Sequence, residues 1–243
     1  MPPYLSLIHI LIIFGGLGFL VILDILKKRS FKKLMLHSKI VIITTVVLIV
    51  AGTLLLKATE DVSWLGAFFQ SVSARTAGFS TYPIGEFTNA GLFTLIILMF
   101  IGASPGSTGG GIKTSTFFVL IQQVRSLFTK KQIGAFRRSI SAETLSKSSI
   151  IVLLSLLLVC IGTFLLCILE PECSFVKLLF EEVSAFGTVG LSTGITPGLA
   201  DGSKMVLIFT MFAGRVGAFT LLSIWIERPA PTVHYTEESI TVG

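Results

Sequence analysis

The chain has 243 residues, of which 52% are hydrophobic and only 13% are charged. Soluble domains carry about 25% charged residues, so a mean hydropathy of +0.89 excludes an ordinary water-soluble fold and indicates a membrane protein. The formal net charge of +6 does not predict a nucleic-acid partner, because the basic residues cluster in two segments between apolar stretches, 27–39 and 113–147. Cytoplasmic loops concentrate Lys and Arg in this way, so both segments are predicted to be cytoplasmic.

The first apolar stretch, residues 4–26, is long enough to cross a hydrocarbon core of about 30 Å. It lacks the basic start and the small-residue cleavage site of a signal peptide, so it is interpreted as a spanning helix. Its Phe14-Gly15-Gly16 resembles a later Phe100-Ile101-Gly102, and both stretches run into basic segments. Residues 4–26 are therefore predicted to be the inner helix of a preceding unit.

A complete unit is predicted at residues 40–128. It contains an outer helix at 40–56, a short helix at about 62–74, and an inner helix that starts at 88–103 and resumes at 113–128. The short helix is too brief to cross a bilayer. Irregular backbone at membrane depth must be buried in protein or line a water-filled cavity. The segment after the short helix is therefore predicted to line a pore.

A second complete unit is predicted at residues 148–226. Its outer helix is expected at 148–169, its short helix at about 174–185 and its inner helix at 203–226. Residues 227–243 are predicted to form a cytoplasmic tail.

A short motif recurs after the short helix of each unit, at 76–81 and 188–193. The later copy begins with Thr-Val-Gly, the first three residues of the TVGYG loop of potassium pores, where backbone carbonyls replace the hydration shell of the ion. Glycine adopts the unusual backbone angles that direct successive carbonyls toward one axis. The alternative is a pair of ordinary glycine-containing turns. The candidate filter residues, with K⁺ held at backbone carbonyls alone, are Thr76, Ala77, Gly78, Thr188, Val189 and Gly190.

The inner helix of the first complete unit is interrupted at residues 102–113 by glycines and a proline, which cannot continue an α-helix. Its hydroxyl side chains can pair the freed backbone groups. A flexible loop directly below a filter is placed to gate it, although a simple cytoplasmic loop is the alternative. The aligned part of the second unit is expected to stay helical through Val216, Gly217, Ala218 and Phe219. The candidate gate residues are Gly102, Ser104, Gly106, Ser107, Thr108, Gly109, Gly110, Gly111, Lys113 and Arg215.

The same loop resembles a phosphate-binding loop, because Gly106 and Gly111 precede Lys113 and Thr114. The pattern G-x-x-x-x-G-K-[ST] fails by one inserted residue, and no β-strand is predicted before it. A membrane enzyme that binds a nucleotide here is the weaker alternative. Because no nucleophile–base constellation is visible either, neither an enzymatic activity nor a cofactor is predicted.

Charged residues at membrane depth are the other candidates. Arg215 lies midway along an apolar stretch, where a charge costs at least about 2.5 kcal/mol. It is expected to bond loop carbonyls or hydroxyls and to form a positive barrier below the filter; a purely structural role is the alternative. Arg75 either donates to carbonyls nearby or faces the outer solvent. Glu181 and Glu182 either concentrate cations or bond to the filter backbone.

The chain contains, in order, the runs RTAGFST, MFIGASPGSTGGGIKTS, SAFGTVGLSTG and MFAGRVG. Together they resemble the Trk/Ktr superfamily of potassium transporters, specifically the pore-forming membrane subunit. The resemblance implies an all-α membrane protein of four M1–P-loop–M2 units around one pseudo-fourfold pore. It also implies that this chain holds the end of the second unit, the third and fourth units and the natural C-terminus. Residues 102–113 match the family's gating loop, and Arg215 matches its arginine beneath the filter.

The resemblance further implies a homodimer in the bacterial cytoplasmic (inner) membrane, regulated by a cytoplasmic ring of nucleotide-binding subunits. Docking of that ring is expected at residues 27–39, 125–147 and 227–243. Both visible filter glycines fit potassium preference, whereas relatives that admit sodium often carry serine in one filter. The alternative is a two-unit cation channel subunit that pairs with a second copy and admits sodium.

Overall fold

The computed structural model describes residues 4–129, 133–136, 138–217 and 220. Two adjacent strands, β1 (Gly134–Ala135) and β2 (Arg138–Ser139), form a small antiparallel hairpin in an otherwise helical chain. Single 3₁₀ turns lie at Phe31–Lys33, Ile84–Glu86 and Thr196–Gly198. The α-helices of the described part are α1 (Tyr4–Leu17), α2 (Phe19–Lys28), α3 (Leu36–Thr59), α4 (Trp64–Ser73), α5 (Asn89–Phe100), α6 (Thr114–Thr129), α7 (Ala142–Leu169), α8 (Phe175–Phe186) and α9 (Asp201–Val216).

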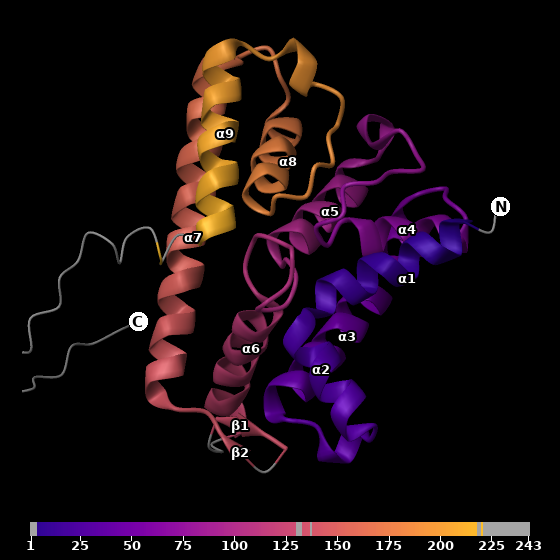
Figure 1. Cartoon of the computed structure of the whole chain (residues 1–243). Helices are drawn as coiled ribbons and strands as arrows, with labels where there is room; N and C mark the ends of the chain where they lie inside the picture. Colours follow the sequence, from indigo (N-terminus) through magenta and orange to yellow (C-terminus); the bar gives the residue numbers. More distant parts are fainter. Residues whose placement is uncertain (1–3, 130–132, 137, 218–219, 221–243) are drawn as a thin grey trace, which may run out of the picture.

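The helices fall into two groups joined by α5 and α6. Figure 1 shows α1 to α4 on one side of the molecule, α7 to α9 on the other, and α5, its following loop and α6 between them. The short helix α4 packs against α3 and α1, and the short helix α8 packs against α7, α9 and α5. Within the described ranges, α3 and α7 are each long and apolar enough to cross a membrane alone. The short helices lie within two residues of the predicted bounds, and each begins after a serine, Ser63 or Ser174.

The first apolar stretch forms two helices, so the expectation of one continuous helix over 4–26 is wrong. The chain bends by 95° between α1 and α2. Gly18 sits at the bend with a φ of 79°, a left-handed conformation that side chains other than glycine rarely adopt. A Cβ atom at this position would lie 2.7 Å from Ser104 Oγ. The bend therefore depends both on a glycine backbone and on close packing against the broken segment.

The last inner helix also ends earlier than predicted. Helix α9 stops at Val216, and Gly217 has a φ of 93°, so the expected helix through Gly217 is wrong. The helix ends early because Gly217 has a positive φ, which an α-helix excludes. Of residues 218–226 the structure describes only Thr220, and the predicted tail at 227–243 lies outside the described residues.

Two equivalent carboxylates join the outer and inner helices of the two groups. Glu60 follows α3 and accepts hydrogen bonds from Thr88 N (3.0 Å) and Thr88 Oγ1 (2.6 Å) at the start of α5. Glu170 follows α7 and accepts from Ala200 N (2.6 Å) and Ser203 Oγ (2.7 Å) at the start of α9. A carboxylate at a helix N-terminus satisfies free N–H groups and interacts favourably with the helix dipole. The internal repeat thus includes the junction between helices.

We expect the Glu170 junction to make stability depend on acidic pH. The Ser203 hydroxyl and then the Ala200 N–H stabilise the carboxylate and lower its pKa below the usual 4.5. The stabilisation is therefore complete above about pH 4.5 and is lost as the pH falls through the lowered folded-state pKa. Glu170→Gln should lower the melting temperature at pH 7 and flatten its decline in acid. Thermal unfolding in detergent measures both, with Glu172→Gln in the same loop as the control. An unchanged acid slope in Glu170→Gln would contradict this assignment.

Candidate functional site

Each short helix ends directly before one of the predicted filter segments. The backbone φ is positive at Thr76 (82°), Gly78 (76°), Thr188 (50°) and Gly190 (92°). The first and third residues of both segments are thus left-handed, while the residue between them is not. Such an alternation allows successive carbonyls to point toward the same side of a chain, whereas the carbonyls of a strand alternate. The positive φ of the two glycines was expected. The positive φ of the two threonines was not, because a β-branched residue rarely adopts it.

A serine near the end of each short helix holds the residue that follows the filter glycine. Ser73 Oγ donates to Phe79 O, and Ser184 Oγ donates to Leu191 O at 2.6 Å. The carbonyls of the same serines accept hydrogen bonds from the second filter residues, Ala77 N at 3.0 Å and Val189 N at 2.9 Å. Equivalent atoms therefore make equivalent bonds in both units. This favours one filter-like structure present twice over two unrelated turns.

The two filter segments touch one another. A Cβ atom on Gly78 would overlap the carbonyl oxygen of Val189, so a side chain cannot be placed there without moving one segment. The second segment also faces an open cavity, which it lines together with Leu207 and Met211 of α9. The carbonyl-bearing backbone of the two repeats is therefore gathered at one place in the molecule.

The outer end of each filter segment is held by the short helix before it. Gln70 Nε2 lies 2.5 Å from Ser80 Oγ in the first unit. In the second unit the aligned residue is Glu181, a buried carboxylate that accepts from Thr193 N (2.8 Å), Thr193 Oγ1 (2.9 Å) and Thr196 Oγ1 (2.7 Å). Of its two predicted roles, Glu181 therefore bonds to the backbone next to the filter.

Glu182 has a different environment from its neighbour. Its side chain is fully buried and accepts from Thr210 Oγ1 at 2.8 Å on α9. A Cβ atom on Gly162 of α7 would overlap the Glu182 carboxylate. Glu182 thus packs between three helices and does not contribute to the filter contacts that Glu181 makes.

The broken segment lies directly against both filter threonines. Gly110 N donates to Thr188 Oγ1 at 3.1 Å. A Cβ atom on Gly109 would lie 2.5 Å from Thr76 Oγ1, and one on Gly110 would lie 2.7 Å from Thr188 Oγ1. Two consecutive glycines therefore let the loop approach both filter segments. In Figure 1 the loop is the coil between α5 and α6 near the middle of the molecule.

Two positive side chains hold adjacent carbonyls of this loop. Arg215 Nη1, in the last turn of α9, donates to Thr108 O, as the sequence predicted. Lys113 Nζ donates to Gly109 O at 2.5 Å. The C-terminus of a helix carries a partial negative charge, which favours Arg215 at that position. Two cationic groups thus lie at the end of the loop that touches the filters.

The other end of the loop is attached to the bend between α1 and α2. Ser104 N donates to Gly16 O at 3.0 Å, and Ser104 Oγ donates to Leu17 O at 2.5 Å. Ser107 Oγ donates to Ser104 O at 2.6 Å within the loop. Two of the three predicted hydroxyls therefore pair freed backbone groups, while Thr108 provides its carbonyl to Arg215. The contribution of α1 to this site was not predicted, because nothing local in the sequence indicates it.

The remaining candidate gate residues shape the loop. Gly106 (φ 75°) and Gly111 (φ 69°) are left-handed, and Ile112 N donates to Phe100 O at 3.1 Å, which closes the loop across its base. A Cβ atom on Gly102 would overlap Gly110 O, so the two arms of the loop touch. Arg75 is only 5% exposed and points inward, with Nη2 3.2 Å from Gly102 O. Of the two predicted roles of Arg75, exposure to the outer solvent is wrong; the side chain does donate to a carbonyl, but to that of Gly102 in the broken segment.

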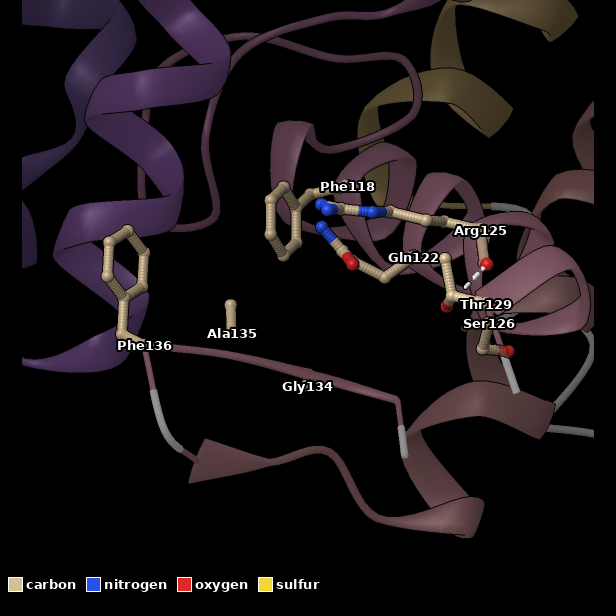
Figure 2. Close-up of a pocket in the computed structure, with 8 residues that line it drawn as sticks. All are labelled: Phe118, Gln122, Arg125, Ser126, Thr129, Gly134, Ala135 and Phe136. Carbon is tan, nitrogen blue, oxygen red and sulfur yellow. Dashed lines mark hydrogen bonds between the residues drawn. The ribbon is translucent and has the colours of Figure 1, made fainter. Parts of the chain in front are cut away.

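A separate cavity of about 400 Å³ lies at the far end of α6, between that helix and the β1–β2 hairpin. Figure 2 shows Phe118, Gln122 and Arg125 of α6 on one side and Ala135 and Phe136 on the other. The residues that line this cavity lie in the basic segment 125–147 or just before it, far along the chain from residues 76–78 and 188–190.

Comparison with known proteins identifies the family. A family model for TrkH, described as a cation transport protein, matches residues 34–232. The chain belongs to the TrkH family. It is 41% identical over 249 residues to the Ktr system potassium uptake protein B of Vibrio alginolyticus, covering 96% of this chain and 54% of that protein. It is 36% identical over 257 residues to the potassium/sodium uptake protein NtpJ of Enterococcus hirae, covering 98% of this chain and 57% of that protein.

A solved structure supports the fold independently. The crystal structure of the potassium transporter TrkH from Vibrio parahaemolyticus aligns with a TM-score of 0.71 and 20% identity, covering 90% of this chain and 51% of that one. The prediction of an all-α membrane fold with repeated pore units is confirmed, apart from the short hairpin. This TrkH-family chain spans about half the length of the curated relatives it matches.

Proposed function

We propose that this chain takes part in potassium uptake across the bacterial cytoplasmic membrane, with K⁺ crossing between the carbonyls of residues 76–78 and 188–190. The observation that carries the proposal is the shared backbone alternation at Thr76 and Gly78 and at Thr188 and Gly190, in two segments that touch. Fixed carbonyl dipoles can replace the water around a cation without trapping it. The names of the relatives, one a potassium and one a potassium/sodium uptake protein, agree with an alkali cation as substrate.

The loop at residues 102–113 is the proposed gate in its closed position. Gly109 and Gly110 lie against the filter threonines, and Arg215 and Lys113 add positive charge at the same level. A positive charge in a narrow, poorly solvated passage raises the energy of a cation there. Conduction therefore requires the loop to move away from the filter.

The proposed pore has four units, of which this chain supplies two filter segments and, in α1 and α2, the inner helix of a third. The complete protein is proposed to form a homodimer. Relatives named as protein B of a Ktr system support a transporter of several components. We place docking of a cytoplasmic nucleotide-binding subunit at residues 27–39 and 125–147, including the cavity in Figure 2, and at the tail 227–243.

Uptake by the four-unit protein tests this function. The chain is expressed together with the upstream units in a bacterium that lacks its own potassium uptake systems, and growth at low K⁺ and uptake of radioactive Rb⁺ and Na⁺ are measured. We expect saturable Rb⁺ uptake that excess K⁺ suppresses and excess Na⁺ does not. Protein present in the membrane without uptake above the empty-vector level would contradict the proposal. Suppression by Na⁺ equal to that by K⁺ would indicate the sodium-permeable alternative, and uptake by a dimer of this chain alone would indicate the two-unit channel.

A further inference from the structure

Arg75 connects the first filter segment to the start of the gating loop. It follows helix α4 and directly precedes Thr76, and its Nη2 donates to Gly102 O at 3.2 Å. Helix α5 ends at Phe100, so the carbonyl of Gly102 has no helical partner further along the chain. The arginine therefore supplies a donor to a carbonyl that the break in the inner helix has freed.

The neighbouring residue holds the other arm of the same loop. Gly109 packs against the side chain of Thr76, and Gly102 lies so close to Gly110 that a Cβ atom would overlap its carbonyl. Both arms of the loop thus rest on two consecutive residues of the filter segment, Arg75 and Thr76. Withdrawal of the loop must break contacts with both.

The second unit shows what occupies this position when the inner helix is continuous. Arg75 aligns with Phe186 or Gly187, because the repeat contains a one-residue insertion here, and Gly102 aligns with Gly214. In the second unit it is the backbone of Phe186 that lies against the inner helix, because a Cβ atom on Gly214 would overlap Phe186 O. Here, however, helix α9 continues through Gly214 to Val216. An aromatic residue therefore stands beside the unbroken helix, and an arginine beside the broken one.

The arginine is costly at this site. Its side chain is 5% exposed, and its Nε has no hydrogen-bond partner among the described residues. Within the same ranges, none of the three ion pairs includes Arg75. A small cavity beside it has a mainly apolar lining: Ile12, Ile13, Gly16, Thr45, Ile49 and Val72. Burial of an unpaired charge opposes folding, so an apolar residue such as that in the second unit would be the better choice for stability alone.

We propose that Arg75 is a positioning residue that locks the gating loop to the filter of its own unit, so that the position of the gate and the shape of that filter are coupled. The proposal rests on the proposed function, because it assigns the loop as the gate. Loss of the guanidinium releases Gly102, loosens the contact between Gly109 and Thr76, and admits water to the loop from the cytoplasmic side.

The accessibility of the loop provides the test. In the four-unit protein with its native cysteines replaced by alanine, Ser107→Cys serves as a reporter, and its rate of modification by a charged thiol reagent added from the cytoplasmic side is measured. Arg75→Met should raise this rate about tenfold or more, the effect expected for loss of one hydrogen bond to a charged group. Arg75→Lys keeps the charge and one donor and should give a smaller increase. Lys177→Met, which removes a positive charge from helix α8, is the matched control and should leave the rate unchanged.

The outcomes separate a positioning role from a structural one. The modification rate is measured only on protein that elutes as a folded species in detergent. If Arg75→Met does not fold, the rates of Arg75→Gln and Arg75→Lys provide the test. A rate equal to that of the parent in the folded variants overturns the proposal, even if their yield falls. The same variants should lower the ratio of K⁺ to Na⁺ uptake, and an unchanged ratio contradicts the coupling to the filter. Because thiol modification needs no transport, absence of uptake by the parent protein would refute the proposed function without deciding this inference.

Discussion

Replacement of Gly78 by alanine is expected to reduce K⁺ uptake by at least about tenfold. The left-handed backbone at this position, with a φ of 76°, costs about 1–2 kcal/mol for a residue with a Cβ atom. The new methyl group would also overlap Val189 O, so the two filter segments must separate and their carbonyls can no longer share one ion. The initial rate of radioactive Rb⁺ uptake, normalised to the amount of protein in the membrane, measures the effect.

Two further glycines control this experiment. Gly198→Ala lies in open space without a positive φ, so its uptake should equal that of the parent protein. Gly190→Ala also places a side chain at a positive φ, here 92°. Its Cβ atom would not be crowded, because the nearest atom, Gly78 Cα, is 3.9 Å away. Its loss should be intermediate. Equal uptake by the Gly78 and Gly198 variants would show that residues 76–78 are not part of the ion path.

Replacement of Arg215 by alanine is expected to raise uptake in the absence of any regulatory subunit. The variant loses the hydrogen bond from the guanidinium to Thr108 O and one of the two cationic groups at the loop. A hydrogen bond to a charged group contributes about 1.5–3 kcal/mol, so the closed position should be weakened about tenfold to a hundredfold. Rb⁺ flux into vesicles that contain the membrane protein alone measures the change.

The matched control for this variant is Lys147→Ala. Lys147 carries the same charge but pairs with Glu143 at an exposed position at the start of α7. Its removal should leave the flux of the isolated membrane protein unchanged. If Arg215→Ala conducts no faster than Lys147→Ala, Arg215 does not hold the gate, and its role in the fold is purely structural.

The elements that the sequence predicted well are those with strong local signals. The short helices α4 and α8 each begin after a serine, and the break at residues 102–113 contains three consecutive glycines. The repeated Thr-x-Gly segments were visible because both copies retain the same residues. These features depend on neighbours in sequence, so they could be recognised without the fold.

The bends at Gly18 and Gly217 could not be predicted in the same way. Each glycine lies within an apolar stretch, where hydropathy indicates only a membrane span. The bend at Gly18 is formed against Ser104, a residue far along the chain. The two inner helices of the complete units were expected to differ in continuity. They do differ: α5 ends at Phe100 and is followed by the loop 102–113, whereas α9 continues through the aligned Gly214 to Val216 and ends at Gly217.

Among the site residues, too, the features that depend on distant contacts could not be predicted from the sequence. The positive φ of Thr76 and Thr188 was unexpected, because a β-branched residue resists it unless surrounding contacts impose it. Ser73 and Ser184 in the preceding helices bond Phe79 O and Leu191 O, at the far end of each segment, and Gly110 N bonds Thr188 Oγ1. Sequence spacing also could not separate the roles of adjacent Glu181 and Glu182, since successive residues of a helix point about 100° apart.

The position of the ion itself tests the central claim most directly. Crystals of the four-unit protein grown with Tl⁺ in place of K⁺ would show the ion by its anomalous scattering. We predict density between the backbone carbonyls of Thr76 and Ala77 and those of Thr188 and Val189, above the loop that carries Gly109 and Gly110. Density that is absent from this place and lies instead beside carboxylate side chains would contradict the proposed filter.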